Sequence, residues 1–131
     1  NILQEKGNDI AIFGNGVLLP RLFAAAEELE KRGVGVTLVE VHTVKPIDVE
    51  GVAEVLGSCG AAVTAEDHNI IGGMGSAIME VAAENIPVPI SRIGLRDEFP
   101  GSGKPDELLD HYGMSVQDIV DAALNTIARK V

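Results

Sequence analysis

The stretch "AAVTAEDHNIIGGMGSAI", residues 61–78, contains the signals that decide the fold. Its first five residues, 61–65, are small or β-branched and predict a buried strand. Helical spacing of apolar residues returns from Ser76 to Glu84, and the loop between is rich in glycine. A strand that passes through a glycine loop into a helix is typical of α/β domains. The loop itself is a candidate catalytic centre, phosphate cradle or plain connection.

The same alternation of strand and helix extends in both directions from this stretch. Further strands are predicted at 9–14, 34–41 and 88–93, and "NILQE" at 1–5 is a candidate short strand. Helices are predicted at 18–31, after Asp48, at 105–111 and at 116–129, with a long loop at 94–103. This order predicts a layered α/β domain with a largely parallel sheet and helices on both faces.

Individual residues set the expected element boundaries. Asp48 is the expected N-cap of a short helix, and Ser115 with Asp118 has capping-box spacing. Met114 is positioned to pack on Ile119 as a hydrophobic staple. Pro89 cannot donate to a strand ladder, so its strand is expected at a sheet edge.

Composition excludes several classes of protein. The 131 residues correspond to about one domain, and 46% of them are apolar, which suffices for a hydrophobic core. A formal net charge of −10 leaves no basic footprint for nucleic acid. No apolar run has the length of a membrane span, and the single Cys59 favours a reducing compartment. The start at Asn1 rather than Met suggests a piece of a longer chain.

The "GNG" at 14–16 imitates a dinucleotide-binding fingerprint. It follows a strand and opens a helix, and Glu40 near the end of the next strand would bind a ribose. The third glycine position holds Leu19, so the match is partial. A tight strand-to-helix turn is the preferred interpretation of Gly14 and Gly16, because two glycines are a weak motif.

The loop "EDHNIIGGMGS", 66–76, offers several chemistries. His68 beside two acids is a candidate general base or metal ligand. Neighbouring residues on an extended backbone point to opposite sides, which argues against convergence on one ion. The glycines could expose backbone N–H groups to an anion at the helix N-terminus, but no Lys is present for a P-loop. A structural loop that needs close backbone approach is the favoured interpretation.

The remaining candidates favour structural roles. The segment "SGKPDELLDHYG", 102–113, could bind an anion but is better explained as a capped surface helix. Cys59 has no adjacent base or cation, which indicates an inert buried thiol, and His42 is likewise interpreted as structural. No complete active site or metal site emerges from the residues.

Four segments together resemble one family. "VEVHTVKPID", "AVTAEDHNIIGGMGSAI", "VPISRIGLRDEF" and "SGKPDELLDHYG" are similar, in order and spacing, to the transketolase C-terminal domain. The resemblance covers essentially the whole chain and is greatest for the C-terminal section of transketolases split over two polypeptides. Deoxyxylulose-phosphate synthase and the β-subunit of 2-oxoacid dehydrogenases end in related domains and remain as alternatives.

The resemblance implies a single domain over 1–131 with a three-layer α/β/α fold. Its mixed, mostly parallel five-stranded sheet would have the order 1-3-2-4-5, with the first strand antiparallel. It implies an accessory or assembly domain of a transketolase, which moves two-carbon ketol units between sugar phosphates in the cytoplasm. Thiamine diphosphate and Mg²⁺ would lie between diphosphate-binding and pyrimidine-binding domains that this chain lacks. No cofactor and no catalytic residue are expected here, and the full enzyme is expected to be a homodimer or heterotetramer, with no nucleic acid or membrane partner.

In that sheet the second and fourth strands are neighbours whose connections leave toward opposite faces. Such a topological switch point forms a crevice at the carboxyl ends of the strands. The residues expected to line it, here called the switch-point set, are Gly14, Asn15, Gly16, Asp67, His68, Gly72, Gly73 and Ser76. We expect this crevice to be filled by a neighbouring domain or to hold a small anion. A dinucleotide module using Gly14, Gly16 and Glu40 is the distant alternative.

Overall fold

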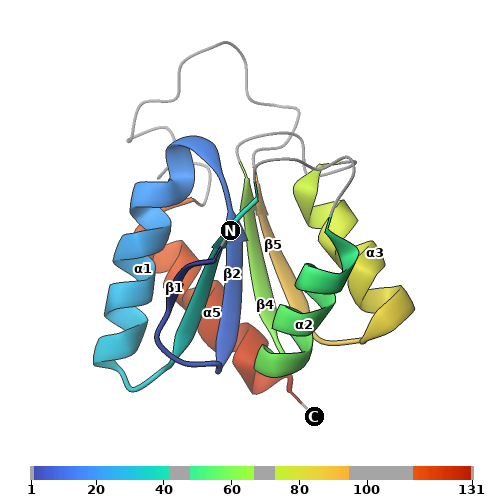
Figure 1. The fold of residues 1–131 in the computed structure, drawn as a ribbon. Coiled ribbons are helices and arrows are strands. Elements are labelled where there is room, and N and C mark those ends of the chain that lie inside the picture. The colour runs from blue at the N-terminus through green and yellow to red at the C-terminus, as the bar shows by residue number, and fades with distance from the viewer. Residues whose placement is uncertain (1, 42–47, 67–72, 95–113, 131) are drawn as a thin grey trace.

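The computed structural model describes residues 2–41, 48–66, 73–94 and 114–130. Five strands form one sheet: β1 (Ile2–Glu5), β2 (Ile10–Gly14), β3 (Val36–Glu40), β4 (Ala62–Glu66) and β5 (Ile90–Gly94). The helices are the 3-10 turn η1 (Gly16–Leu18), α1 (Leu19–Lys31), α2 (Val49–Cys59), α3 (Met74–Asn85) and α5 (Val116–Ala128). Figure 1 shows α1 and α5 on one face of the sheet and α2 and α3 on the other.

The strand order is β1-β3-β2-β4-β5, as the family resemblance implied. β1 is antiparallel to β3, while β2 is parallel to both β3 and β4, and β5 is parallel to β4. β5 is therefore an edge strand, which confirms the prediction from its proline. Pro89 itself lies just before the strand, where its carbonyl accepts a hydrogen bond from Ala62 N at 3.1 Å.

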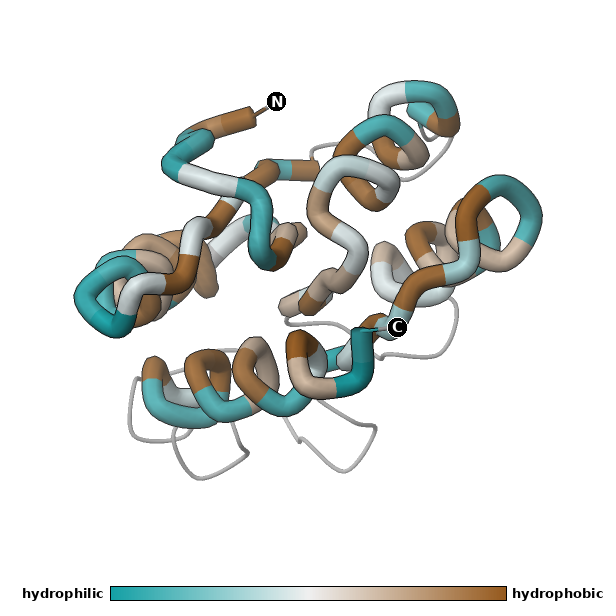
Figure 2. Tube along the Cα trace, turned by 90° about the horizontal axis from the view of Figure 1, so that it is seen from below, coloured by the Kyte–Doolittle hydropathy of each residue, from teal (hydrophilic) through white to brown (hydrophobic). Residues whose placement is uncertain are grey.

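Strand alternation divides the core into two layers. Odd-numbered positions of β4, such as Val63 and Ala65, lie in the cluster under α1 and α5. Even-numbered positions, such as Ala62, belong to the side that α2 and α3 cover. Both central strands, β2 and β4, are fully buried. In Figure 2 the helix at the C-terminal end, α5, turns its hydrophobic positions toward the sheet and its hydrophilic positions away.

Most predicted boundaries are confirmed to within two residues. Asp48 accepts a hydrogen bond from Gly51 N at 3.0 Å, and Ser115 with Asp118 forms a reciprocal capping box. Met114 and Ile119 are both fully buried in one cluster, as a staple requires. Gly94, where the loop 94–103 was predicted to begin, is the last residue of β5. The rest of that loop, the predicted helix at 105–111 and His42 lie outside the described residues.

The observed start of α3 differs from the predicted one by two residues. α3 begins at Met74 rather than Ser76, because the carboxylate of Glu66 satisfies backbone N–H groups that would otherwise have no partner in the first turn.

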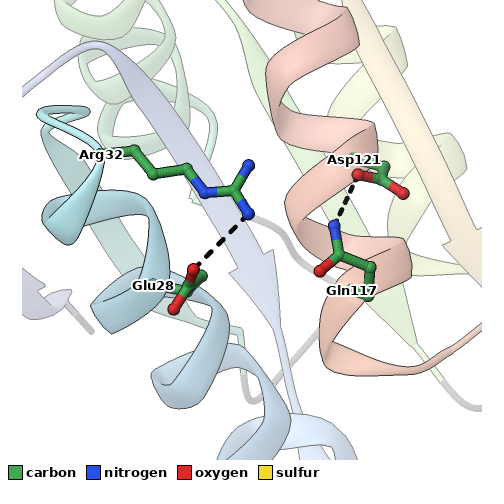
Figure 3. A network of polar contacts seen from close by, with 4 residues as sticks. All are labelled: Glu28, Arg32, Gln117 and Asp121. Carbon is green, nitrogen blue, oxygen red and sulfur yellow. Dashed lines mark hydrogen bonds and ion pairs between the residues drawn. The ribbon is translucent and has the colours of Figure 1, made fainter.

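The outer surfaces of α1 and α5 carry polar side chains, although Phe23 of α1 is 42% exposed. Arg32, the C-cap of α1, donates to Glu28 at 3.5 Å, and Gln117 of α5 donates to Asp121 at 2.8 Å. Figure 3 shows both pairs. Each pair is spaced four residues apart on its own helix, which stabilises that helix by roughly 0.2–0.5 kcal/mol. The packing of α1 on α5 therefore depends on their buried apolar faces rather than on these exposed pairs.

Candidate functional site

The carboxyl ends of β2 and β4 lie side by side, and the chain leaves them toward opposite faces. Gly14, the last residue of β2, is in register with Ala65 of β4. η1 and α1 follow β2 on one face of the sheet, whereas α3 follows β4 on the other (Figure 1). This arrangement is a topological switch point, the place where open α/β sheets hold their ligands.

The residues after β2 are engaged by the protein itself. A Cβ on Gly14 would lie 2.1 Å from Leu22 Cδ1 and 3.2 Å from Ala65 O, so α1 packs directly on the strand backbone. Asn15 Nδ2 donates to Val41 O at 3.4 Å, and Val41 N donates to Gly14 O at 3.0 Å. Gly16 has a φ of +62°, which favours glycine, and nothing lies within 4 Å of its missing Cβ. These contacts explain "GNG" as a tight strand-to-helix turn.

The residues after β4 converge on Glu66. Its side chain is buried, with 2% exposure, and its oxygens accept hydrogen bonds from Met74 N at 2.8 Å and Gly75 N at 2.9 Å. Bonds from backbone N–H to an ionised carboxylate are among the stronger ones in proteins. A negative charge at this end of α3 is also favoured by the helix dipole. Glu66 is thus the cap of α3, a structural role for the first residue of this loop, whereas His68, the candidate general base or metal ligand, lies outside the described residues.

The glycines of the loop allow the carboxylate to come close. A Cβ on Gly73 would lie 2.7 Å from both carboxylate oxygens of Glu66. A Cβ on Gly75 would lie 2.9 Å from Thr64 Oγ1 and 3.1 Å from Arg92 Nε. The structure therefore supports the interpretation of this loop as one that needs close backbone approach.

Arg92 is the polar residue that sequence reasoning missed. It lies opposite Thr64 in the β4–β5 ladder and donates from Nη2 to Ser76 Oγ at 3.0 Å. Its Nε is buried and has no hydrogen-bond partner among the described residues. Strand periodicity was the available signal, since Thr64, Glu66 and Arg92 all occupy even positions and face α3.

Three members of the switch-point set, Asp67, His68 and Gly72, lie outside the described residues. Of the other five, Gly14 ends β2 and Asn15 and Gly16 follow it, whereas Gly73 is the N-cap of α3 and Ser76 lies in its first turn. The two groups thus lie at the ends of two adjacent parallel strands, β2 and β4. Glu66 and Arg92 contact the second group, at the start of α3.

The part of the chain that the structure describes does not fit thiamine diphosphate. No group of three or more His, Cys, Asp and Glu side chains there could hold the metal ion that accompanies a diphosphate. The first two N–H groups of α3, which would be the donors to a phosphate at this end of the sheet, already bind Glu66. The Glu66 carboxylate would also repel a second anion.

Cys59 lies away from the switch point, at the end of α2, and is buried with 2% exposure. Burial raises the pKa of its thiol above the ordinary value, while a hydrogen bond with Thr37 and the charge of Lys130 oppose that shift. A buried, protonated thiol is a poor nucleophile, in agreement with its predicted inert role.

None of the helices in the described ranges has the length and apolar character needed to cross a bilayer.

Comparison with known proteins identifies a family that shares this sequence pattern. Residues 1–119 match the family described as "Transketolase, C-terminal domain". A subunit of 6-deoxy-6-sulfo-D-fructose transketolase, SqwH from Clostridium sp. (strain MSTE9), is 42% identical over 128 residues, which are 98% of this chain and 40% of that protein. The 1-deoxy-D-xylulose-5-phosphate synthase of Acidobacterium capsulatum is 42% identical over 114 residues, or 86% of this chain and 18% of the synthase.

A solved structure shares the whole fold. It is described as a split gene transketolase, an inactive β4 tetramer. It matches 100% of this chain and 43% of its own length, with a TM-score of 0.91 and 37% identity. This chain therefore spans well under half the length of these relatives. It belongs to the transketolase C-terminal domain family.

Proposed function

We propose that this chain is the C-terminal accessory and assembly domain of a transketolase that transfers two-carbon ketol units between sugar phosphates. The observation that supports this most directly is the 42% identity, over 98% of the chain, to a transketolase subunit. The related split-gene structure also matches the chain over its full length. The domain itself carries no catalytic residue in this proposal.

The catalytic apparatus belongs to other domains in this proposal. Thiamine diphosphate with Mg²⁺ supplies the carbanion chemistry of ketol transfer when bound in the complete enzyme. Diphosphate-binding and pyrimidine-binding domains, on the same polypeptide or on a partner subunit, hold that cofactor. The complete enzyme is a homodimer or a heterotetramer. The poor fit of the described residues to a diphosphate supports this division of labour.

The switch-point set is the proposed contact with those domains. Gly14, Asn15 and Gly16 lie at the carboxyl end of β2, which pairs with β4, and open α/β domains bind their ligands at such a switch point. A small anion is the second proposed occupant. The distant alternative, a dinucleotide bound at Gly14, Gly16 and Glu40, requires space beside Gly14 that Leu22 fills.

The test is reconstitution. The polypeptide that contains this domain is combined with the subunit that carries the diphosphate-binding domain, and ketol transfer between a ketose phosphate and an aldose phosphate is assayed with thiamine diphosphate and Mg²⁺. We expect activity from the pair and none from this chain alone. Calorimetric titration of the chain with NAD⁺, and separately with thiamine diphosphate plus Mg²⁺, should show no binding. Micromolar NAD⁺ binding would refute the assignment.

A second candidate function is supported by the similarity to 1-deoxy-D-xylulose-5-phosphate synthase. The same reconstituted enzyme would then condense pyruvate with an aldose phosphate and release CO₂. Supplying pyruvate as the donor in place of a ketose phosphate distinguishes the two functions. Oxidative turnover of a 2-oxoacid would instead indicate a 2-oxoacid dehydrogenase.

A further inference from the structure

Glu66 lies where an external anion would bind. The N-terminus of a helix combines free N–H groups with the positive end of the helix dipole and therefore attracts phosphate or carboxylate groups. At α3 those groups are the N–H of Met74 and the N–H of Gly75, which point at the two oxygens of Glu66 from 2.8 and 2.9 Å. Because Glu66 is 2% exposed, the carboxylate is enclosed within the protein.

The glycines at the start of α3 leave just enough room for the carboxylate of Glu66. Gly73 brings its backbone so close that an added Cβ would lie 2.7 Å from each oxygen of Glu66. A Cβ added to Gly75 would lie 3.4 Å from Glu66 Oε1 and 2.9 Å from Thr64 Oγ1. Glycine-rich loops before helices often accommodate a bound phosphate. Here the same residue pattern accommodates the side chain of the strand that precedes the loop.

Arg92 adds a positive charge to the same place. Its Nη2 is bonded to Ser76 Oγ on the first turn of α3, and its Nε lies 3.1 Å from the position of a Gly75 Cβ. The buried Nε has no hydrogen-bond partner within the described ranges. The surroundings of Glu66 therefore favour an anion through a cation as well as through backbone donors.

We propose that Glu66 is an internal ligand that closes the N-terminus of α3 to outside anions. This inference rests on the proposed function and narrows it, because it excludes a small anion from the N-terminus of α3, which is one side of the switch-point set. It also means that the donors around Glu66 form a complete anion site once the carboxylate is removed.

Chemical rescue tests this directly. Glu66→Ala removes the CH₂–COO⁻ group, which has the size and charge of acetate. The variant of the full chain should unfold at a lower temperature than the wild type. Acetate at ten times its dissociation constant should raise the Tm of the variant by about 3–5 °C relative to sodium chloride of equal ionic strength. The wild type should show no such gain, because its own carboxylate occupies the donors.

Two further variants control the experiment. Glu66→Gln fills the same volume without a charge and should gain nothing from acetate. Glu84→Ala removes the same charge from an exposed position near the other end of α3, and it should likewise be unaffected by acetate.

Three results would overturn the proposal. The first is an equal gain in Tm from acetate in wild type and Glu66→Ala. The second is the absence of any gain in Glu66→Ala. The third applies if that variant is unfolded at the outset, and it is a failure of acetate to restore its far-UV circular dichroism. Because none of these measurements involves ketol transfer, failure of this inference is distinguishable from failure of the proposed function.

Discussion

Substitution of Gly14 tests whether the glycines of "GNG" are needed for packing or for binding a ligand. In Gly14→Ala the new Cβ would lie 2.1 Å from Leu22 Cδ1 and 3.2 Å from Ala65 O. Leu22 is fully buried and cannot move aside into solvent. Overpacking of this kind costs about 1–3 kcal/mol. We therefore expect the free energy of unfolding to fall by that amount.

A double-mutant cycle with Leu22→Ala isolates the clash. Leu22→Ala alone should destabilise by roughly 2–5 kcal/mol, because it leaves a cavity. The double variant should be more stable than the sum of the two single effects predicts, by about 1–2 kcal/mol, since the clash disappears with the leucine side chain. Urea denaturation followed by circular dichroism measures all four proteins.

Gly16→Ala is the matched control for this cycle. No atom lies within 4 Å of its added Cβ, but its φ of +62° is strained for alanine and should cost about 1–2 kcal/mol. Its effect should be additive with Leu22→Ala. Additivity of Gly14→Ala with Leu22→Ala would refute the packing explanation, and loss of NAD⁺ binding with unchanged stability would support the fingerprint.

Three other perturbations test individual parts of the fold. Asp48→Ala removes the acceptor for Gly51 N and should destabilise the protein by about 1 kcal/mol in urea denaturation, whereas the exposed Glu54→Ala on the same helix should change stability by less than about 0.5 kcal/mol. Ser115→Ala breaks the capping box of α5 and should cost about 0.5–2 kcal/mol, measured in the same way, and an unchanged midpoint would show that the box adds nothing. Because burial raises the pKa of Cys59 in the folded state, its contribution to stability is complete below the unfolded pKa of about 9 and decreases as the pH rises above it. The difference in unfolding free energy between wild type and Cys59→Ala should therefore shrink as the pH rises above about 9, and a constant difference would contradict the assignment.

Local sequence signals determined most of the element boundaries. Continuous runs of mostly apolar residues predicted β2 and β4, because a strand that is buried on both faces of the sheet does not alternate polar with apolar residues. Capping residues gave the starts of α2 and α5, since a cap acts on backbone groups only three residues away. The four family segments gave the strand order and the antiparallel first strand, which the structure confirms. No local pattern specifies such an order, because it depends on pairings between distant residues.

Only the tertiary structure decided how the polar residues of the glycine loop are used. The sequence shows Glu66 beside Asp67 and His68, which suggested acid–base or metal chemistry as one option. The fold turns the carboxylate of Glu66 inward onto α3, eight and nine residues further along the chain, where two backbone donors bind it. Arg92 reaches Ser76 from the neighbouring strand at a separation of 16 residues. These contacts arise from the pairing of β4 with β5 and the packing of α3 on the sheet, and sequence spacing alone does not encode them.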